Sequence, residues 1–152
     1  MLLVVWLHLL AVVTWMGGLL FGSHFVAPRL ARAGEAERGL LAELLRRVRL
    51  VAWMAITLLI VTGLINLAQV LRAPALLERG AGQLLALKLF LALIALYLTA
   101  HRDFAVLPRL LKASPQETPR PLKGLGWFDR IVLLLLLAIL YLGLAISRLV
   151  HA

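Results

Sequence analysis

Three side chains with a capacity for chemistry lie inside long apolar stretches of this chain: His8, Asn66 and Lys88. An ammonium group in hydrocarbon costs about 3 kcal/mol or more unless it has a partner, so an intramembrane lysine marks a candidate functional site. A neutral imidazole can bind a metal ion or a haem iron, and an amide can hydrogen-bond a bound group. These residues therefore predict a polar site within an apolar protein.

Four apolar segments must position these groups. Apart from Lys88, no formal charge occurs in residues 2–27, 50–71, 80–100 and 131–147. Roughly 20 apolar residues cross the ~30 Å hydrocarbon core of a bilayer, and the fourth segment reaches that length once Trp127 and Phe128 are counted as its start. The first segment has no basic residues before it and is longer than the apolar part of a signal peptide, so we expect a retained span.

The sequence thus predicts an all-α integral membrane protein, a four-helix up-down-up-down bundle forming one domain over residues 1–152. Spans are expected at about 2–27, 50–71, 80–100 and 128–148, with long loops at 28–49 and 101–127. At 1.5 Å per residue, His8, Asn66 and Lys88 all lie roughly 8–12 Å below the same membrane boundary. They can meet around one centre; alternatively, Lys88 extends its stem to the interface while His8 bonds a neighbouring helix.

The net charge of +9 is distributed unevenly. Arginine and lysine crowd the two long loops, and few occur on the opposite side of the predicted membrane, at Arg72, Arg79 and Arg148. This is the positive-inside pattern, which places the long loops in the cytoplasm and both termini outside. Because no nucleic-acid motif accompanies the charge, we expect contact with anionic lipid and no nucleic-acid partner. The absence of cysteine excludes disulfides, Fe–S clusters and covalent c-type haem attachment.

The connecting segments show few further features. Pro28 is expected to follow the end of the first span, and residues 35–49 are typical of an amphipathic extension of the second. Residues 108–126 contain four prolines and are expected to form a flexible or extended linker. No repeat period is evident, although the first two and the last two spans would form similar helical hairpins.

Small and polar residues at three- and four-residue spacing predict the inward face of each span, because such residues let membrane helices approach closely. The predicted inward stripes are His8, Ala11, Trp15, Gly18 and Gly22; then Ala55, Thr62, Asn66 and Gln69; then Lys88, Ala92, Ala95 and Thr99; and lastly Ala138, Tyr141 and Ala145.

Two weaker candidates accompany the main site. His24 and His101 end the first and third spans on the same side, where two imidazoles could hold a metal or haem, or simply lie at the interface without a ligand. Trp15 with Gly17 and Gly18 allows either close helix packing or room for a flat macrocycle.

The arrangement of His8, Trp15 and Gly18, with Thr62-Gly63 in the second helix and Leu87-Lys88-Leu89 in the third, resembles a known superfamily. That superfamily joins CopD-type copper-resistance membrane domains to HemJ-type protoporphyrinogen oxidases. The HemJ-type resemblance implies haem b and an essential histidine and lysine, here His8 and Lys88, whereas the CopD-type resemblance implies copper movement across the inner membrane. After Trp15 the run through His24 to Pro28 and Arg29 departs from the HemJ-type pattern and is closer to the CopD-type one.

The resemblance leaves three functions open. The first is a haem-b redox protein: His8 would be an axial ligand, Lys88 a catalytic group, second ligand or propionate partner, and the groups lining the haem would come from Trp15, Gly18, Asn66, Gln69 and Tyr141. Its substrate would be a quinol or a porphyrinogen. The second is a copper transport or homeostasis protein of the bacterial inner membrane, which receives copper at His8 from an external partner. The third is a non-catalytic subunit of a larger membrane complex. A second copy of the chain is a further candidate partner.

Overall fold

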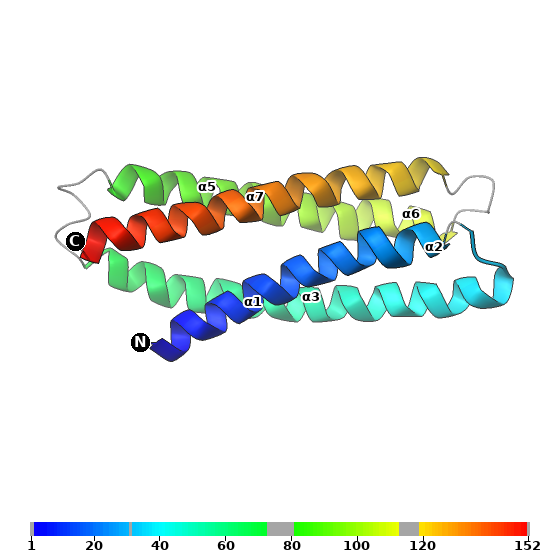
Figure 1. The fold of residues 1–152 in the computed structure, drawn as a ribbon, viewed down its shortest axis with the longest axis horizontal. Coiled ribbons are helices and arrows are strands. Elements are labelled where there is room, and N and C mark those ends of the chain that lie inside the picture. The colour runs from blue at the N-terminus through cyan, green and yellow to red at the C-terminus, as the bar shows by residue number, and fades with distance from the viewer. Residues whose placement is uncertain (1, 31, 73–80, 113–118, 152) are drawn as a thin grey trace.

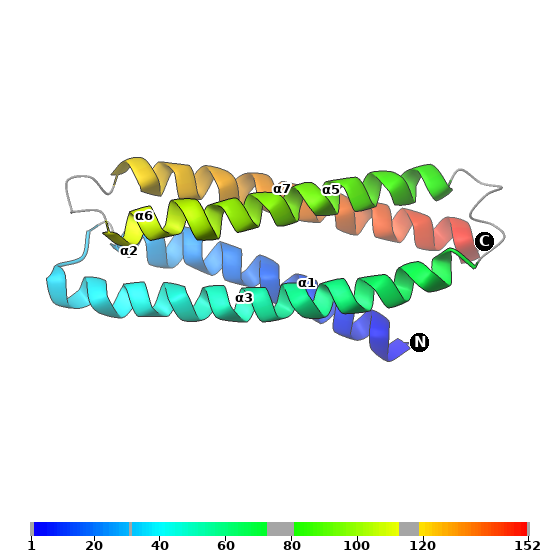
Figure 2. The same cartoon turned by 180° about the vertical axis from the view of Figure 1, so that it is seen from behind.

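A computed structural model describes residues 2–30, 32–72, 81–112 and 119–151, which are almost entirely helical. Among these residues, four helical rods are long and apolar enough to cross a membrane: Leu2–Leu30, Glu35–Val70, Ala81–Lys112 and Gly124–Leu149. Figures 1 and 2 show them lying side by side as an antiparallel bundle. The predicted all-α four-helix membrane bundle is confirmed.

The first rod is helical for longer than the sequence predicted. Helix α1 (Leu2–Phe21) runs into a π-helical turn, η1 (Gly22–Val26), and then into α2 (Ala27–Leu30). Pro28 therefore lies within the rod, and the expectation that it follows the end of the helix was wrong. A proline ring clashes with the carbonyl four residues earlier in an α-helix. The wider π turn just before it, closed by the Ala27 N–H on the Gly22 carbonyl, makes room for the ring.

The third rod has the same construction. Helix α5 (Ala81–His101) leads into η2 (Arg102–Val106) and α6 (Leu107–Lys112), and Pro108 lies just beyond this second π turn. The second and fourth rods are single helices, α3 (Glu35–Val70) and α7 (Pro119–His151). The helical extension at 35–49 is as predicted. The linker predicted over 108–126 was wrong at 108–112, which belong to α6, and at 119–126, where α7 begins; residues 113–118 lie outside the described residues. Pro119 and Pro121 occupy the first turn of α7, where helices tolerate proline.

Helices α1 and α3 pack along each other as one hairpin, and α5 and α7 form the other. We call the end of the bundle that holds both chain termini the terminal end, and the opposite end, where α2 leads to α3 and α6 to α7, the loop end (Figure 1). Both hairpins start at the terminal end, so they run in the same direction through the bundle.

Two apolar clusters join the hairpins. The first lies at mid-height and includes Trp15, Ile56, Ala95 and Leu136. The second lies at the loop end and includes Leu30, Leu45, Leu110 and Leu125. Many large apolar side chains on the outside of the bundle are exposed, as expected for helices whose outer faces meet lipid.

The predicted inward faces are correct for the first three rods and wrong for the fourth. Ala11, Trp15, Thr62 and Thr99 are buried, whereas Ala138 is exposed and Tyr141 is 72% exposed. The buried stripe of α7 is instead made of large apolar residues, namely Val132, Leu136, Leu142 and Ile146. Val132 and Leu136 belong to the mid-height apolar cluster, and turning Tyr141 inward would require a partner for its hydroxyl group.

Candidate functional site

His8 is held by two neighbouring residues of α3. Its Nδ1 lies 2.9 Å from Oγ1 of Thr62, a side chain that is only 3% exposed. A Cβ atom on Gly63 would stand 3.3 Å from His8 Cε1, so the glycine allows the ring to approach α3 closely. Thr62 supplies the contact that the sequence assigned to Asn66.

The hydrogen bonding of Thr62 favours one tautomer of this imidazole. The Thr62 hydroxyl lies 2.7 Å from the Leu58 carbonyl and 3.3 Å from the Leu59 carbonyl. When it donates its one proton to either carbonyl, its oxygen accepts a proton from His8 Nδ1. The second ring nitrogen, Nε2, then carries a free lone pair. Histidines that bind metals have this arrangement, because a hydrogen bond at one nitrogen fixes the other as the ligand.

Lys88 lies in the opposite hairpin. A Cβ atom on Gly143 of α7 would stand 3.2 Å from Lys88 Nζ, so the ammonium group rests against the α7 backbone. The lysine is half-buried. The structure therefore places His8 and Lys88 on the inward stripes of the two hairpins, both near the terminal end.

Asn66 and Gln69 lie on α3 between this pair and the terminal end, and both are half-buried. Neither side chain forms a hydrogen bond with another described residue. His8 thus contacts Thr62 where Asn66 was expected, Lys88 rests against Gly143, and the convergence of imidazole, amide and amine on one centre stays a prediction.

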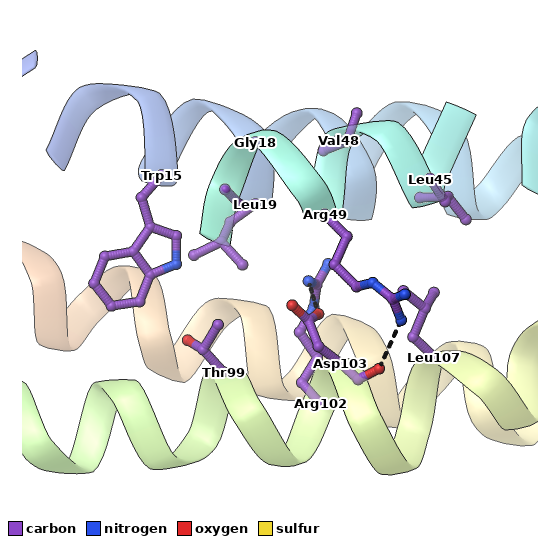
Figure 3. Close-up of a pocket in the computed structure, with 11 residues that line it drawn as sticks. Trp15, Gly18, Leu19, Leu45, Val48, Arg49, Thr99, Arg102, Asp103 and Leu107 are labelled. Carbon is purple, nitrogen blue, oxygen red and sulfur yellow. Dashed lines mark hydrogen bonds and ion pairs between the residues drawn. The ribbon is translucent and has the colours of Figure 1, made fainter. Parts of the chain in front are cut away.

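Trp15 and Gly18 take part in close packing. Trp15 is 3% exposed, and a Cβ atom on Gly18 would lie 3.6 Å from Val48 and 3.8 Å from Ala52 of α3. Beside them is a cavity of about 10 Å³, shown in Figure 3, which is about the room one water molecule needs. A haem is far larger than that, so the described interior around Trp15 does not fit a macrocycle, and the haem prediction gains no support.

The remaining predicted site residues are not brought together. His24 is exposed, with its Nδ1 2.9 Å from the hydroxyl of the adjacent Ser23. His101 is exposed and packs against Phe128 at 5.3 Å between ring centroids. Tyr141 lies on the outer face of α7.

A buried polar layer between the two apolar clusters was missed by the sequence reasoning. It consists of Arg49, Trp53, Arg102, Asp103 and Asp129. The Arg102 guanidinium lies 2.5 Å from Asp103 Oδ1 and 2.6 Å from Asp129 Oδ1, and all three side chains are at most 6% exposed. The charge of Arg102 is therefore met by two carboxylates.

Contacts within this layer tie the two hairpins together. Trp53 of α3 donates its indole N–H to Asp103 Oδ2 at 2.8 Å, and Arg49 donates to the Asp103 backbone carbonyl at 3.3 Å, as Figure 3 shows. The π turn η2 carries both Arg102 and Asp103, consistent with the tendency of π turns to occur where side chains need special placement.

The signal that could have identified the layer was the pair of carboxylates Asp103 and Asp129, each of which lies a few residues from the predicted edge of a span. Charges so placed resemble ordinary loop charges, and Arg102 lies within the loop expected at 101–127. These residues are buried only because the helices continue beyond the predicted edges of the spans.

Where side chains are described, no three His, Asp or Glu residues group as a metal site of several ligands would require. No curated protein and no solved structure matched the chain. The family model for copper resistance protein D matches residues 42–147, a region that contains Gly63, Lys88 and Gly143 and begins after His8. Since this match covers more than half of the sequence, the chain belongs to the copper resistance protein D (CopD) family.

Proposed function

We propose that this protein moves copper across a membrane or holds it there for homeostasis, and that His8 is its copper ligand. The family supports copper as the cargo. The observation that carries the choice of His8 is its hydrogen bond with Thr62, which leaves Nε2 as the free ligand atom. Imidazole nitrogen suits copper, and His8 lies near the terminal end, where an ion entering from that side would reach it early.

The test is Cu(I) binding to the purified protein in detergent, measured by competition with a chromophoric chelator. His8→Ala is expected to lose most of the binding, at least about tenfold in affinity. The matched control is His24→Ala, which removes an exposed imidazole from the same rod and should bind as the wild type does. Equal binding by wild type and His8→Ala would contradict the assignment.

The direction of movement follows from orientation. We propose that the protein lies in a bacterial inner membrane with the loop end in the cytoplasm and both termini outside, because arginine and lysine are concentrated near the loop end. A reporter fused after Ala152 should then behave as external. A cytoplasmic signal would place His8 near the opposite face and reverse the proposed direction of copper entry.

A further inference from the structure

The two hairpins repeat each other at a constant spacing. The π turns η1 (Gly22–Val26) and η2 (Arg102–Val106) begin eighty positions apart. Each ends on a valine that is followed, after one residue, by Pro-Arg-Leu, at positions 28–30 and 108–110. π turns are rare, so two in equivalent places, with the same residues after them, indicate that one hairpin is a copy of the other.

Burial repeats at the same spacing along both helices of the hairpin. Many buried residues of the first hairpin pair with buried residues eighty positions later, among them Trp15 and Ala95, Leu19 and Thr99, Leu30 and Leu110, Leu45 and Leu125, Ile56 and Leu136, and Thr62 and Leu142. The shared offset means that no insertion or deletion separates the copies over these elements. The repeat that was not evident from the sequence is therefore present, and the copies are parallel, related by an axis along the bundle.

The same offset relates the two halves of the candidate site. His8 and Lys88 are equivalent positions, and so are Gly63 and Gly143, the glycines against which they rest. Each copy thus directs a polar side chain of its first helix at a glycine of its second helix, at one depth. Both lie on the buried stripes of their helices, His8 with Ala11 and Trp15, and Lys88 with Ala95 and Thr99. The two side chains are therefore directed at the interior of the bundle at the same depth.

We propose that His8 and Lys88 are the two symmetry-related halves of a single copper site, in which Lys88 stands where a second ligand would stand. This rests on the proposed function. His8 supplies the nitrogen ligand, and the ammonium at the opposing position repels the cation. The repulsion keeps the affinity low, so that copper leaves the site readily, as transport requires.

The juxtaposition can be tested without copper. Because the chain has no cysteine, a double variant with His8→Cys and Lys88→Cys holds only two thiols. Hg(II), which bridges paired thiols, should protect both from maleimide labelling at one mercury per chain, as read by mass spectrometry. The matched control is Leu9→Cys with Leu89→Cys, an equivalent pair one residue along whose side chains are 40% and 42% exposed. That pair should remain open to labelling, and equal behaviour of the two pairs would overturn the proposal.

The role of the charge is tested by three substitutions in the Cu(I) competition assay. Lys88→Gln removes the charge and should tighten binding by about three- to tenfold, whereas Lys88→His adds a second imidazole and should tighten it by more than about tenfold. Leu89→His adds an imidazole on the outward side and should leave the affinity unchanged. Binding by Lys88→His no tighter than by Leu89→His would overturn the proposal. Circular dichroism and gel filtration establish that each variant is folded.

The two proposals fail in different ways. If copper binds the wild type through His8 but the thiol pair is not bridged and Lys88→His gains nothing, the two-half site is wrong and the copper function stands. If the wild type binds no copper while the thiols are bridged and Lys88→His binds Ag(I), a cation that imidazoles also bind, the two-half site is right and the copper function is wrong.

Discussion

The two polar regions of this bundle differ in whether their charged side chains have partners of opposite charge. In the buried layer near the loop end, Arg102 lies between two carboxylates, and Asp103 also accepts a hydrogen bond from Trp53. Near the terminal end, no described carboxylate pairs with Lys88, and His8 keeps one ring nitrogen free. A network in which each charged group has a partner holds helices together. Polar groups that still have a free donor or acceptor atom are suited to binding a ligand.

The repeat sharpens this comparison. At the terminal end the copies keep the same local design, a polar side chain against a glycine. At the loop end they differ, since Gly22 corresponds to Arg102, Ser23 to Asp103 and Arg49 to Asp129. A Cβ atom on Gly22 would lie 3.6 Å from Arg102 Nη2, so the small residue in one copy accommodates the large one in the other. The side chains of the two copies are thus complementary in size at the loop end, and they follow the same design at the candidate site near the terminal end.

The largest effect is expected from Asp129→Asn. Removing one partner of a buried ion pair costs about 3–5 kcal/mol, and we expect the lower end because Asp103 remains beside Arg102. Unfolding in detergent, followed by circular dichroism, measures the loss, and copper affinity should change little. The control is Glu43→Gln, which breaks the exposed pairs with Arg46 and Arg47 and should cost less than about 1 kcal/mol. Similar losses in both variants would mean that the layer is not what joins the hairpins.

A smaller loss of stability is expected from Trp53→Phe. The change keeps most of the apolar packing and removes the indole N–H that donates to Asp103. Hydrogen bonds to charged groups are worth about 1.5–3 kcal/mol, so the midpoint of unfolding should fall by less than it does for Asp129→Asn. Trp127→Phe, at an exposed position, serves as the control, and an equal effect there would argue against the hydrogen bond.

The smallest effects are expected at the two equivalent glycines, and they should be unequal. In Gly63→Ala the new methyl group meets a rigid ring at 3.3 Å, whereas in Gly143→Ala it meets the flexible end of Lys88 at 3.2 Å. The lysine can move aside and the imidazole, fixed by Thr62, cannot do so as easily. We expect Gly63→Ala to weaken Cu(I) binding by about three- to tenfold and Gly143→Ala to change it little. A larger effect of Gly143→Ala would reverse the roles assigned to the two halves.

The sequence predicted the spans well because length and apolar content decide whether a helix can cross a membrane. It also predicted the inward faces of three rods, where Ala11, Thr62 and Ala95 allow close approach. It failed on α7 because Tyr141 and Ala138 were taken as interior residues, while large aliphatic side chains fill that interface.

The polar layer and the repeat were not predicted from the sequence, for two different physical reasons. Arg102 and Asp103 become buried only because the helix continues through a π turn and past Pro108, which a residue-by-residue interpretation takes as a helix end. The two copies share their pattern of burial and their backbone geometry more than their residue types. Apolar side chains can replace one another in a hydrophobic core, so the sequence similarity between the copies is weak. Leu-His-Leu at 7–9 and Leu-Lys-Leu at 87–89 were the visible trace of it.

The paired π turns have a consequence for how this chain can vary. Each holds one residue more than an α-turn would, which rotates the rest of the rod by about 100° around its own axis. Since both outgoing rods are rotated alike, Leu30 and Leu110 arrive in the same apolar cluster. Losing one residue from a single π turn would point the end of that rod in another direction, so a length change in one copy should be tolerated only when the other copy makes the same change.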